Sequence, residues 1–148
     1  MEWIDDLRGK TIGLDTAPLI YFIEENPPYI ETVRLFFEAM DRGDFLVVTS
    51  TVTLLEVLVH PLRSNNRELA TEYRDILLNS RLMTLEVSSA IAEQAAQLRA
   101  AYDIRTPDAI QLSAALNAGA TQFFTNDVRL PNIPSIQILS IDALLKTK

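Results

Sequence analysis

The sequence predicts a single α/β domain over residues 1–148, in which a parallel β-sheet carries helices on both faces. The length and the 48% hydrophobic content are sufficient for one hydrophobic core. Short apolar segments alternate with longer amphipathic ones along the chain, which is the pattern of repeated strand–helix units. One apolar segment, residues 45–49, shows no polar alternation and is typical of a strand buried on both faces.

The first elements are separated by residues that cap or interrupt helices. The apolar segment Thr11–Leu14 is predicted to be a short strand, and Thr16 can cap the helix that follows it. The two prolines after Asn26 interrupt this helix. A second helix then carries its apolar side chains on one side and ends before Gly43, which suits the position after a helix end. The two predicted helices cover residues 16–23 and 28–40.

The middle of the chain is predicted to hold two more strands with a pair of helices between them. After the strand at residues 45–49, a helix over residues 53–60 is expected to stop at Pro61, because a proline ring disrupts a continuing helix. An amphipathic helix over residues 64–79 follows, and residues 82–87 form the third strand.

The last part of the chain repeats the alternation. Ser88 or Ser89 can cap an alanine-rich helix that reaches Tyr102. Thr106 is predicted to cap the next helix, with Pro107 in its first turn. The remaining predicted elements are a helix end at Gly119, strands at residues 121–125 and 136–139, the second of them at the sheet edge, and a terminal helix at residues 140–145.

Composition excludes several classes of protein. The chain contains no cysteine, so no disulfide framework is possible, which fits a reducing cytosol. No apolar run approaches the roughly 20 residues of a membrane span. The acidic N-terminus lacks the apolar stretch of a secretory signal, so we expect a cytoplasmic protein. The net charge of −7 and the pI of about 4.6 argue against tight, non-specific binding to nucleic acid, but they allow a local basic rim.

Four acidic residues stand out by their positions. Asp15 follows the first predicted strand, Glu56 comes after the second, and Asp127 follows the fourth, while Asp108 opens a helix. In a parallel α/β sheet these positions can meet at one edge, where carboxylates repel each other unless a cation joins them. Oxygen-only ligands suit Mg²⁺ or Mn²⁺, which can activate water for attack on a phosphodiester.

Each acid also has a structural explanation. Asp15 could bond the backbone at a helix start, and Glu56 could complete a capping box with Thr53. Asp108 lies where the helix dipole favours an anion, and Asp127 could belong to a plain turn. The occurrence of all four acids at separate element junctions favours a metal site over four unrelated structural roles.

Other chemistries fit the sequence less well. His60 is the only histidine and there is no cysteine, so a zinc site of the usual nitrogen or sulfur type is not expected. The position of His60 beside Pro61, and the absence of a nucleophile-elbow motif, argue against a Ser–His–Asp triad. The four glycines form no Walker A loop.

The acids lie within four short segments, GLDT at residues 13–16, TLLEV at 53–57, RTPDAIQL at 105–112 and FTND at 124–127. The order and spacing of these segments resemble the PIN-domain family and, more narrowly, the VapC-type toxins of bacterial and archaeal toxin–antitoxin pairs. The resemblance covers nearly the whole chain, and the third and fourth segments are its most specific parts.

The resemblance implies a metal-dependent endoribonuclease that hydrolyses single-stranded RNA. The acids matching Asp15, Glu56, Asp108 and Asp127 would hold one or two Mg²⁺ or Mn²⁺ ions, with Asp127 acting through water. Water activated by the metal would attack phosphorus and leave a 5′-phosphate and a 3′-hydroxyl. Thr125 would lie in the same pocket and position a water or a phosphate. The resemblance also implies a homodimer that is silenced by a VapB-type antitoxin.

Two further groups of residues are candidates for contacts. Four arginines near the motif segments could contact phosphates, and each could equally be an ordinary solvated residue. The aromatic side of the first helices could form a dimer or antitoxin groove, or plain core. The arginines are Arg63, Arg67, Arg105 and Arg129, and the aromatic residues are Tyr21, Phe22, Tyr29, Phe36 and Phe37.

Two alternatives without nuclease activity stay open. A receiver-like signalling module would also have an acidic pocket, but it needs an acid after its third strand and a lysine near its last one. This chain has Ser88 after the third strand and no lysine between Lys10 and Lys146. A catalytically silent PIN binding module would keep the fold and bind RNA or protein without cleaving it.

Overall fold

Five strands form one parallel sheet in the order β3-β2-β1-β4-β5, which places β1 at its centre. The structure is a computed structural model and describes residues 2–146. The strand order differs from the 2-1-3-4-5 order of receiver domains, so the receiver-like alternative is wrong. The strands are β1 (Thr11–Leu14), β2 (Leu46–Ser50), β3 (Met83–Leu85), β4 (Gln122–Thr125) and β5 (Gln137–Ser140).

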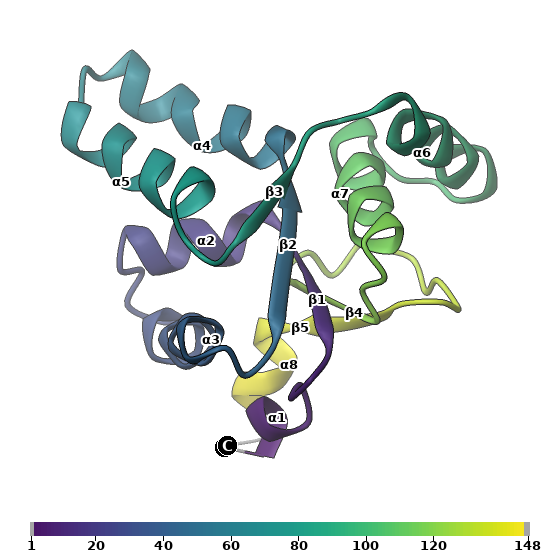
Figure 1. Ribbon diagram of the computed structural model, residues 1–148, viewed down its shortest axis with the longest axis horizontal. Helices are drawn as coiled ribbons and strands as arrows, with labels where there is room; N and C mark the ends of the chain where they lie inside the picture. The colour runs from purple at the N-terminus through teal and green to yellow at the C-terminus, as the bar shows by residue number, and fades with distance from the viewer. Residues whose placement is uncertain (1, 147–148) are drawn as a thin grey trace.

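Helices cover both faces of the sheet, as predicted (Figure 1). One face carries α6 and α7, and the other carries α2, α3, α4 and α5. Within residues 2–146, no helix is both long and apolar enough to cross a membrane. The helices are α1 (Glu2–Asp5), α2 (Thr16–Ile23), α3 (Ile30–Arg42), α4 (Thr51–Arg63), α5 (Arg67–Leu78), α6 (Ser89–Ala101), α7 (Thr106–Asn117) and α8 (Ile141–Lys146).

Each face of the sheet has its own hydrophobic cluster. Neighbouring residues on one strand point to opposite faces, and accordingly Phe124 belongs to the larger cluster while Phe123 belongs to the cluster under α7. Val47 and Val48 on β2 divide in the same way. The prediction that β2 is buried on both faces is therefore confirmed.

The aromatic residues of α2 and α3 belong mainly to the larger cluster. Phe36 and Phe37 are fully buried, and Phe22 stacks on Phe37 with ring centroids 4.4 Å apart. Tyr21 and Tyr29 stack on each other at 4.3 Å and stay partly exposed. The aromatic side of the first helices was expected to form either a partner groove or plain core. The phenylalanines belong to the core.

Gly13 allows helix α7 to lie directly against the central strand. A Cβ atom at this position would lie 2.5 Å from the Cβ atom of Ala115 on α7 and 2.8 Å from the ring of Phe123. Both distances are too short for real contacts, so a glycine is required for this close approach. Gly13 thereby sets the spacing between the strand that leads to Asp15 and the helix that carries Asp108.

Helix α4 starts earlier and ends later than predicted. The hydroxyl of Ser50 caps it by accepting a backbone N–H of the first turn at 3.2 Å. The helix then continues through Pro61, so the predicted stop at this residue is wrong. Pro61 is buried, and the last turn is closed by a hydrogen bond from the Ser64 N–H to the His60 carbonyl at 3.0 Å. Burial of the ring offsets the one helical hydrogen bond that a proline cannot make.

Two predicted helix caps are also wrong. Asp15, not Thr16, is the N-cap residue of α2, and Arg105, not Thr106, is that of α7. The glycines predicted to end α3 and α7 do follow these helices, with left-handed φ angles of 80° and 81°. Helix α1 was not predicted, and the other boundaries differ from the predictions by a few residues.

Candidate active site

Asp15 lies half-buried at the carboxyl end of the central strand. Its Oδ1 atom accepts the backbone N–H of Thr16 at 2.9 Å, and its Oδ2 atom accepts the hydroxyl of Thr125 at 2.7 Å. Burial raises the pKa of Asp15, the two hydrogen bonds lower it, and the charges of Asp108 and Glu56 raise it again. The net shift is upward, so a nearby cation would stabilise the ionised form of this carboxyl group.

Glu56 reaches the same place from the second turn of α4. Its Oε1 atom accepts the hydroxyl of Thr16 at 2.6 Å. The capping box with Thr53 is not formed, because Ser50 caps α4 and the Thr53 side chain is buried in the interior. The structural explanation that competed with a site role for Glu56 is therefore wrong.

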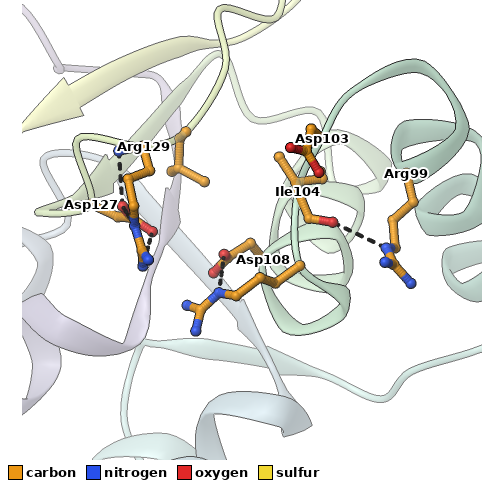
Figure 2. Close-up of a pocket in the computed structure, with 8 residues that line it drawn as sticks. Arg99, Asp103, Ile104, Asp108, Asp127 and Arg129 are labelled. Atoms are coloured by element: carbon orange, nitrogen blue, oxygen red, sulfur yellow. Dashed lines mark hydrogen bonds and ion pairs between the residues drawn. The ribbon is translucent and has the colours of Figure 1, made fainter.

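Asp108 and Asp127 are each paired with an arginine (Figure 2). Arg105 donates from Nε to Asp108 Oδ2 at 3.2 Å. Arg129 donates to Asp127 from its backbone N at 2.9 Å, from Nε at 3.0 Å and from Nη2 at 3.3 Å. Partial burial acts to raise the pKa of Asp127. The hydrogen bonds from Arg129 and the charges of both arginines outweigh it and hold that pKa below its usual value.

Thr125 joins the two acids that follow the neighbouring strands β1 and β4. It is fully buried, and its hydroxyl donates to Asp15 while it accepts the backbone N–H of Asp127 at 3.0 Å. Its side chain does not line the cavity next to the acids. Thr125 thus helps to position Asp15 and Asp127 from the protein interior.

The four predicted acids line one open cavity of about 360 Å³ at the carboxyl edge of the sheet. Arg105 and Arg129 line it too, and both extend into an adjoining cavity of about 400 Å³ (Figure 2). The adjoining cavity also includes the two acids that these arginines bind. Arg63 and Arg67, by contrast, line neither cavity, so only two of the four candidate arginines are placed beside the acids.

The donor set suits a divalent cation, because four carboxylates on separate elements supply oxygen ligands only. Burial is the main cause of the raised pKa of Asp15, and the negative charges of Asp108 and Glu56 add to it. Among residues 2–146, no three acidic, histidine or cysteine side chains converge tightly enough to form a metal-binding cluster as they stand. The other three carboxylates are engaged by a hydroxyl and by the two arginines. Binding of a cation would require at least one of them to change partner.

Several residues that build the site were not assigned from the sequence. The buried amide of Gln111 contacts hydroxyl groups on three other elements. The Arg99 side chain donates to the Ile104 carbonyl at 3.0 Å and to the Thr106 hydroxyl at 2.9 Å, which fixes the approach to α7. One signal was available for Gln111, since it is an amide within the apolar part of α7, one turn after Asp108.

Comparison with protein families identifies a match over most of the chain. The model of a family described as PIN domain matches residues 12–136, a span that contains the four acids and Thr125. Comparison with curated protein sequences gives no significant match.

Solved structures with a similar fold include components of toxin–antitoxin pairs. VapBC2 from Rickettsia felis, bound to a DNA fragment from its promoter, has 20% identity and a TM-score of 0.68 over 88% of this chain and 98% of that chain. A toxin–antitoxin complex from Klebsiella pneumoniae has 22% identity and a TM-score of 0.67 over 88% and 97%. Mycobacterium tuberculosis VapC20, described as a sarcin-ricin loop cleaving toxin, has 17% identity and a TM-score of 0.63 over 76% and 86%. At these identities the similarity establishes a shared fold.

Proposed function

The chain belongs to the PIN domain family, and from this premise we propose that it is a divalent-metal-dependent endoribonuclease that cleaves single-stranded RNA. The observation that carries the proposal is the cavity at the carboxyl edge of the sheet, where four carboxylates from separate elements meet two arginines. A site of this composition can bind both a cation and the phosphates of a nucleic acid.

Asp15, Glu56, Asp108 and Asp127 would hold Mg²⁺ or Mn²⁺ in this cavity. When bound, the metal supplies an activated water and stabilises negative charge on a phosphate oxygen. Asp15 is the best candidate for direct contact, because two hydrogen bonds already fix its carboxylate. Thr125 orients it by donating to Oδ2.

Arg105 and Arg129 are the proposed contacts to the RNA backbone. Both line the cavity that holds the acids, and their guanidinium groups are exposed to solvent. Such groups can exchange a carboxylate for a phosphate, which offers the same bidentate acceptor geometry. With a net charge of −7, the chain has little general attraction for nucleic acid, so RNA binding would depend on these two contacts.

We further propose that the chain is the toxin of a VapBC-type pair, acts in the cytoplasm, forms a homodimer and is silenced by a VapB-type antitoxin. Support comes from the shared fold with structures of toxin–antitoxin complexes. The partner surface we propose is the apolar side of α4, where Leu55, Val59 and Leu62 follow helical spacing and are 65%, 44% and 56% exposed.

A catalytically silent PIN module that binds RNA or protein is the second candidate. The observation that favours it is that no three potential ligands among residues 2–146 converge as they stand. Calorimetric titration with Mn²⁺ separates the two candidates, because the silent module would show no binding.

The test of the nuclease is RNA cleavage by the purified chain with Mn²⁺, with a chelator, and after the single substitutions Asp15→Asn and Asp108→Asn. Cleavage should require the metal and should be lost in both variants. Glu93→Gln is a matched control, because Glu93 is an exposed acid on α6 outside both cavities. Cleavage that persists in both aspartate variants, or in excess chelator, would overturn the proposal.

A further inference from the structure

Gln111 is a buried amide at the point where three acid-bearing elements meet. It lies on α7 three residues after Asp108, and only 2% of its surface is exposed. Its hydrogen-bond partners come from the end of β2, from α4 and from the start of α2. A polar side chain is tolerated in such a place only when its donors and acceptors are satisfied.

The amide of Gln111 has a partner for each of its groups. Its Oε1 atom accepts the hydroxyl of Ser50 at 2.7 Å. Its Nε2 atom donates to the hydroxyl of Thr53 and, more weakly at 3.4 Å, to that of Thr16. One side chain on α7 is therefore bonded to the elements that present Glu56 and Asp15.

The Thr16 hydroxyl has one proton, which fixes the direction of its hydrogen bonds with Glu56 and Gln111. An ionised carboxylate is only an acceptor, so the Thr16 hydroxyl uses its single proton to donate a hydrogen bond to Glu56 at 2.6 Å. The hydroxyl oxygen is then left as an acceptor for the Nε2 proton of Gln111.

A second series of hydrogen bonds, from Gln111 through Thr53 and Thr49 to the Leu14 carbonyl, also runs in one direction. The Thr49 hydroxyl donates a hydrogen bond to the Leu14 carbonyl at 3.0 Å. Because this uses its one proton, its oxygen accepts the hydrogen bond from the Thr53 hydroxyl at 2.8 Å. Thr53 in turn accepts from Gln111. Because the two branches end in acceptor-only groups, a carboxylate and a backbone carbonyl, the hydroxyls of Thr16 and Thr53 both face Gln111 as acceptors. The Nε2 atom of a glutamine amide carries two protons and can donate to both.

We propose that Gln111 and Thr16 are positioning residues that hold the Glu56 carboxylate toward Asp15, an inference that rests on the nuclease function proposed above. Glu56 is exposed, and a long exposed side chain otherwise samples several rotamers. The amide protons of Gln111 direct the Thr16 proton at Glu56, and this hydrogen bond selects one orientation of the carboxylate. Neither residue needs to touch the substrate to have this effect.

The substitutions Thr16→Val and Thr16→Ser form a matched test. Valine keeps the shape but lacks the hydroxyl, whereas serine keeps the hydroxyl. T16V should weaken Mn²⁺ binding, measured by isothermal titration calorimetry, by about 10- to 100-fold, as for other residues that orient metal ligands. It should lower kcat by a similar factor and leave KM for an RNA oligonucleotide nearly unchanged. T16S should restore both quantities.

Gln111→Met tests the centre of the network, because methionine has a similar length and no amide protons. We expect changes in Mn²⁺ affinity and kcat in the same direction as in T16V. Some loss of stability is also expected, since the hydroxyls of Ser50 and Thr53 each lose one hydrogen-bond partner. Thermal unfolding of each variant measures this loss. If Q111M does not fold, T16V and T16S still test the proposal, because Thr16 is half-exposed and its substitution disturbs the core less.

Crystal structures of the metal-free wild type and of T16V give a readout that does not depend on nuclease activity. One Glu56 rotamer in the wild type and several in T16V would support the positioning role. The same single rotamer in both proteins would overturn it, as would unchanged Mn²⁺ affinity in a folded T16V. A wild type that neither binds Mn²⁺ nor cleaves RNA would instead overturn the nuclease function, and the Glu56 rotamers would still decide the positioning role.

Discussion

The buried side and the exposed side of the acidic cavity are held by different kinds of interaction. The buried side comprises Asp15, Thr16, Thr125 and Gln111, and the exposed side comprises Asp108, Arg105, Asp127 and Arg129. On the buried side, hydroxyl and backbone donors fix the carboxylates, and the Gln111 amide donates to the Thr16 hydroxyl behind them. On the exposed side, each carboxylate meets a guanidinium group on a side chain that is 64% or 71% exposed.

This difference determines what each side can do when a ligand arrives. On the buried side, Thr125 and Gln111 are shielded from water, so the hydrogen bonds they make are set before a metal or substrate binds. Exposed ion pairs compete with water and salt and contribute little to stability. The buried side is therefore preorganised, and the arginines of the exposed side are free to change partner.

The largest expected effect comes from comparing Asp15→Asn with Asp127→Asn. Removing the charge of Asp15 would take away the proposed preorganised ligand, so RNA cleavage should fall by more than about 100-fold, beyond the effect typical of residues outside the ligand set. Removing the charge of Asp127 should cost roughly 10-fold, because we expect this acid to act through water. Single-turnover cleavage rates of both variants measure the difference, and equal losses would contradict the division into two sides.

A second substitution, Gln111→Glu, reverses the hydrogen bonds of the buried side while keeping the shape of the side chain. An ionised glutamate accepts only, so the Thr16 hydroxyl would turn toward it and away from Glu56. Cleavage should fall at least about 10-fold at pH 7.

The loss in Q111E should be smaller at lower pH, where a protonated carboxyl can donate one of the missing hydrogen bonds. Gln97→Glu adds the same charge on the exposed surface of α6 and is the matched control. Similar cleavage by Q111E and Q97E across the pH range would show that the direction of the network is unimportant.

The exposed side is tested by Arg105→Gln and Arg129→Gln. RNA affinity, measured in an Asp15→Asn background that prevents cleavage, should fall several-fold. The slope of its salt dependence should fall by about one for each arginine that contacts a phosphate. In the wild-type background, Mn²⁺ should bind more tightly to either variant, because the carboxylates are released.

Arg74→Gln, on α5 and outside the two cavities beside the acids, controls for the loss of one positive charge. An unchanged salt slope in both site variants, or an equal change in R74Q, would show that the two arginines do not contact the RNA.

The smallest expected effect is on stability, and it has opposite signs on the two sides. The pKa of Asp15 is raised by burial, so its ionisation destabilises the fold as pH rises above the ordinary value of 3.8. D15N should therefore unfold at a higher temperature than the wild type at pH 7. The pKa of Asp127 is lowered by Arg129 despite partial burial, so its ionised form stabilises the fold above that value, and D127N should unfold at a lower temperature.

Both differences in unfolding temperature should shrink as the pH falls through 3.8 and below, where the two aspartates become protonated in folded and unfolded states alike. Thermal unfolding followed by circular dichroism between pH 3 and pH 7 is the measurement. Shifts of the same sign in D15N and D127N at pH 7 would contradict the assignment of the two environments.

The parts of the structure that follow from local pattern could be predicted from the sequence. Apolar runs, the turns between them and the alternation of elements led to the parallel sheet and to the edge where the acids meet. The family assignment came from the segments around the same acids. These features depend on neighbours in the sequence, which a single chain displays directly.

The features that could not be predicted depend on distant residues. Pro61 lies inside α4 because its ring is buried, and burial by other elements is not visible in the local sequence. Thr16 resembles a cap locally, yet its hydroxyl is used by Glu56, 40 positions away. The pairing of Asp108 and Asp127 with arginines, in place of converging carboxylates, is a choice of rotamers that no spacing rule predicts.

The central position of β1 has a consequence for biosynthesis. Asp15 is made early, but the hydroxyl that orients it belongs to Thr125, 110 positions later, and the amide behind Thr16 lies 95 positions later. Closing such long loops precedes any gain from the contacts they allow. A nascent chain on the ribosome therefore has no complete site until β4 has emerged and inserted beside β1. The proposed nuclease activity therefore arises only near the end of synthesis, and during most of translation the nascent chain cannot cleave the ribosomal RNA or the messenger RNA that it is made from.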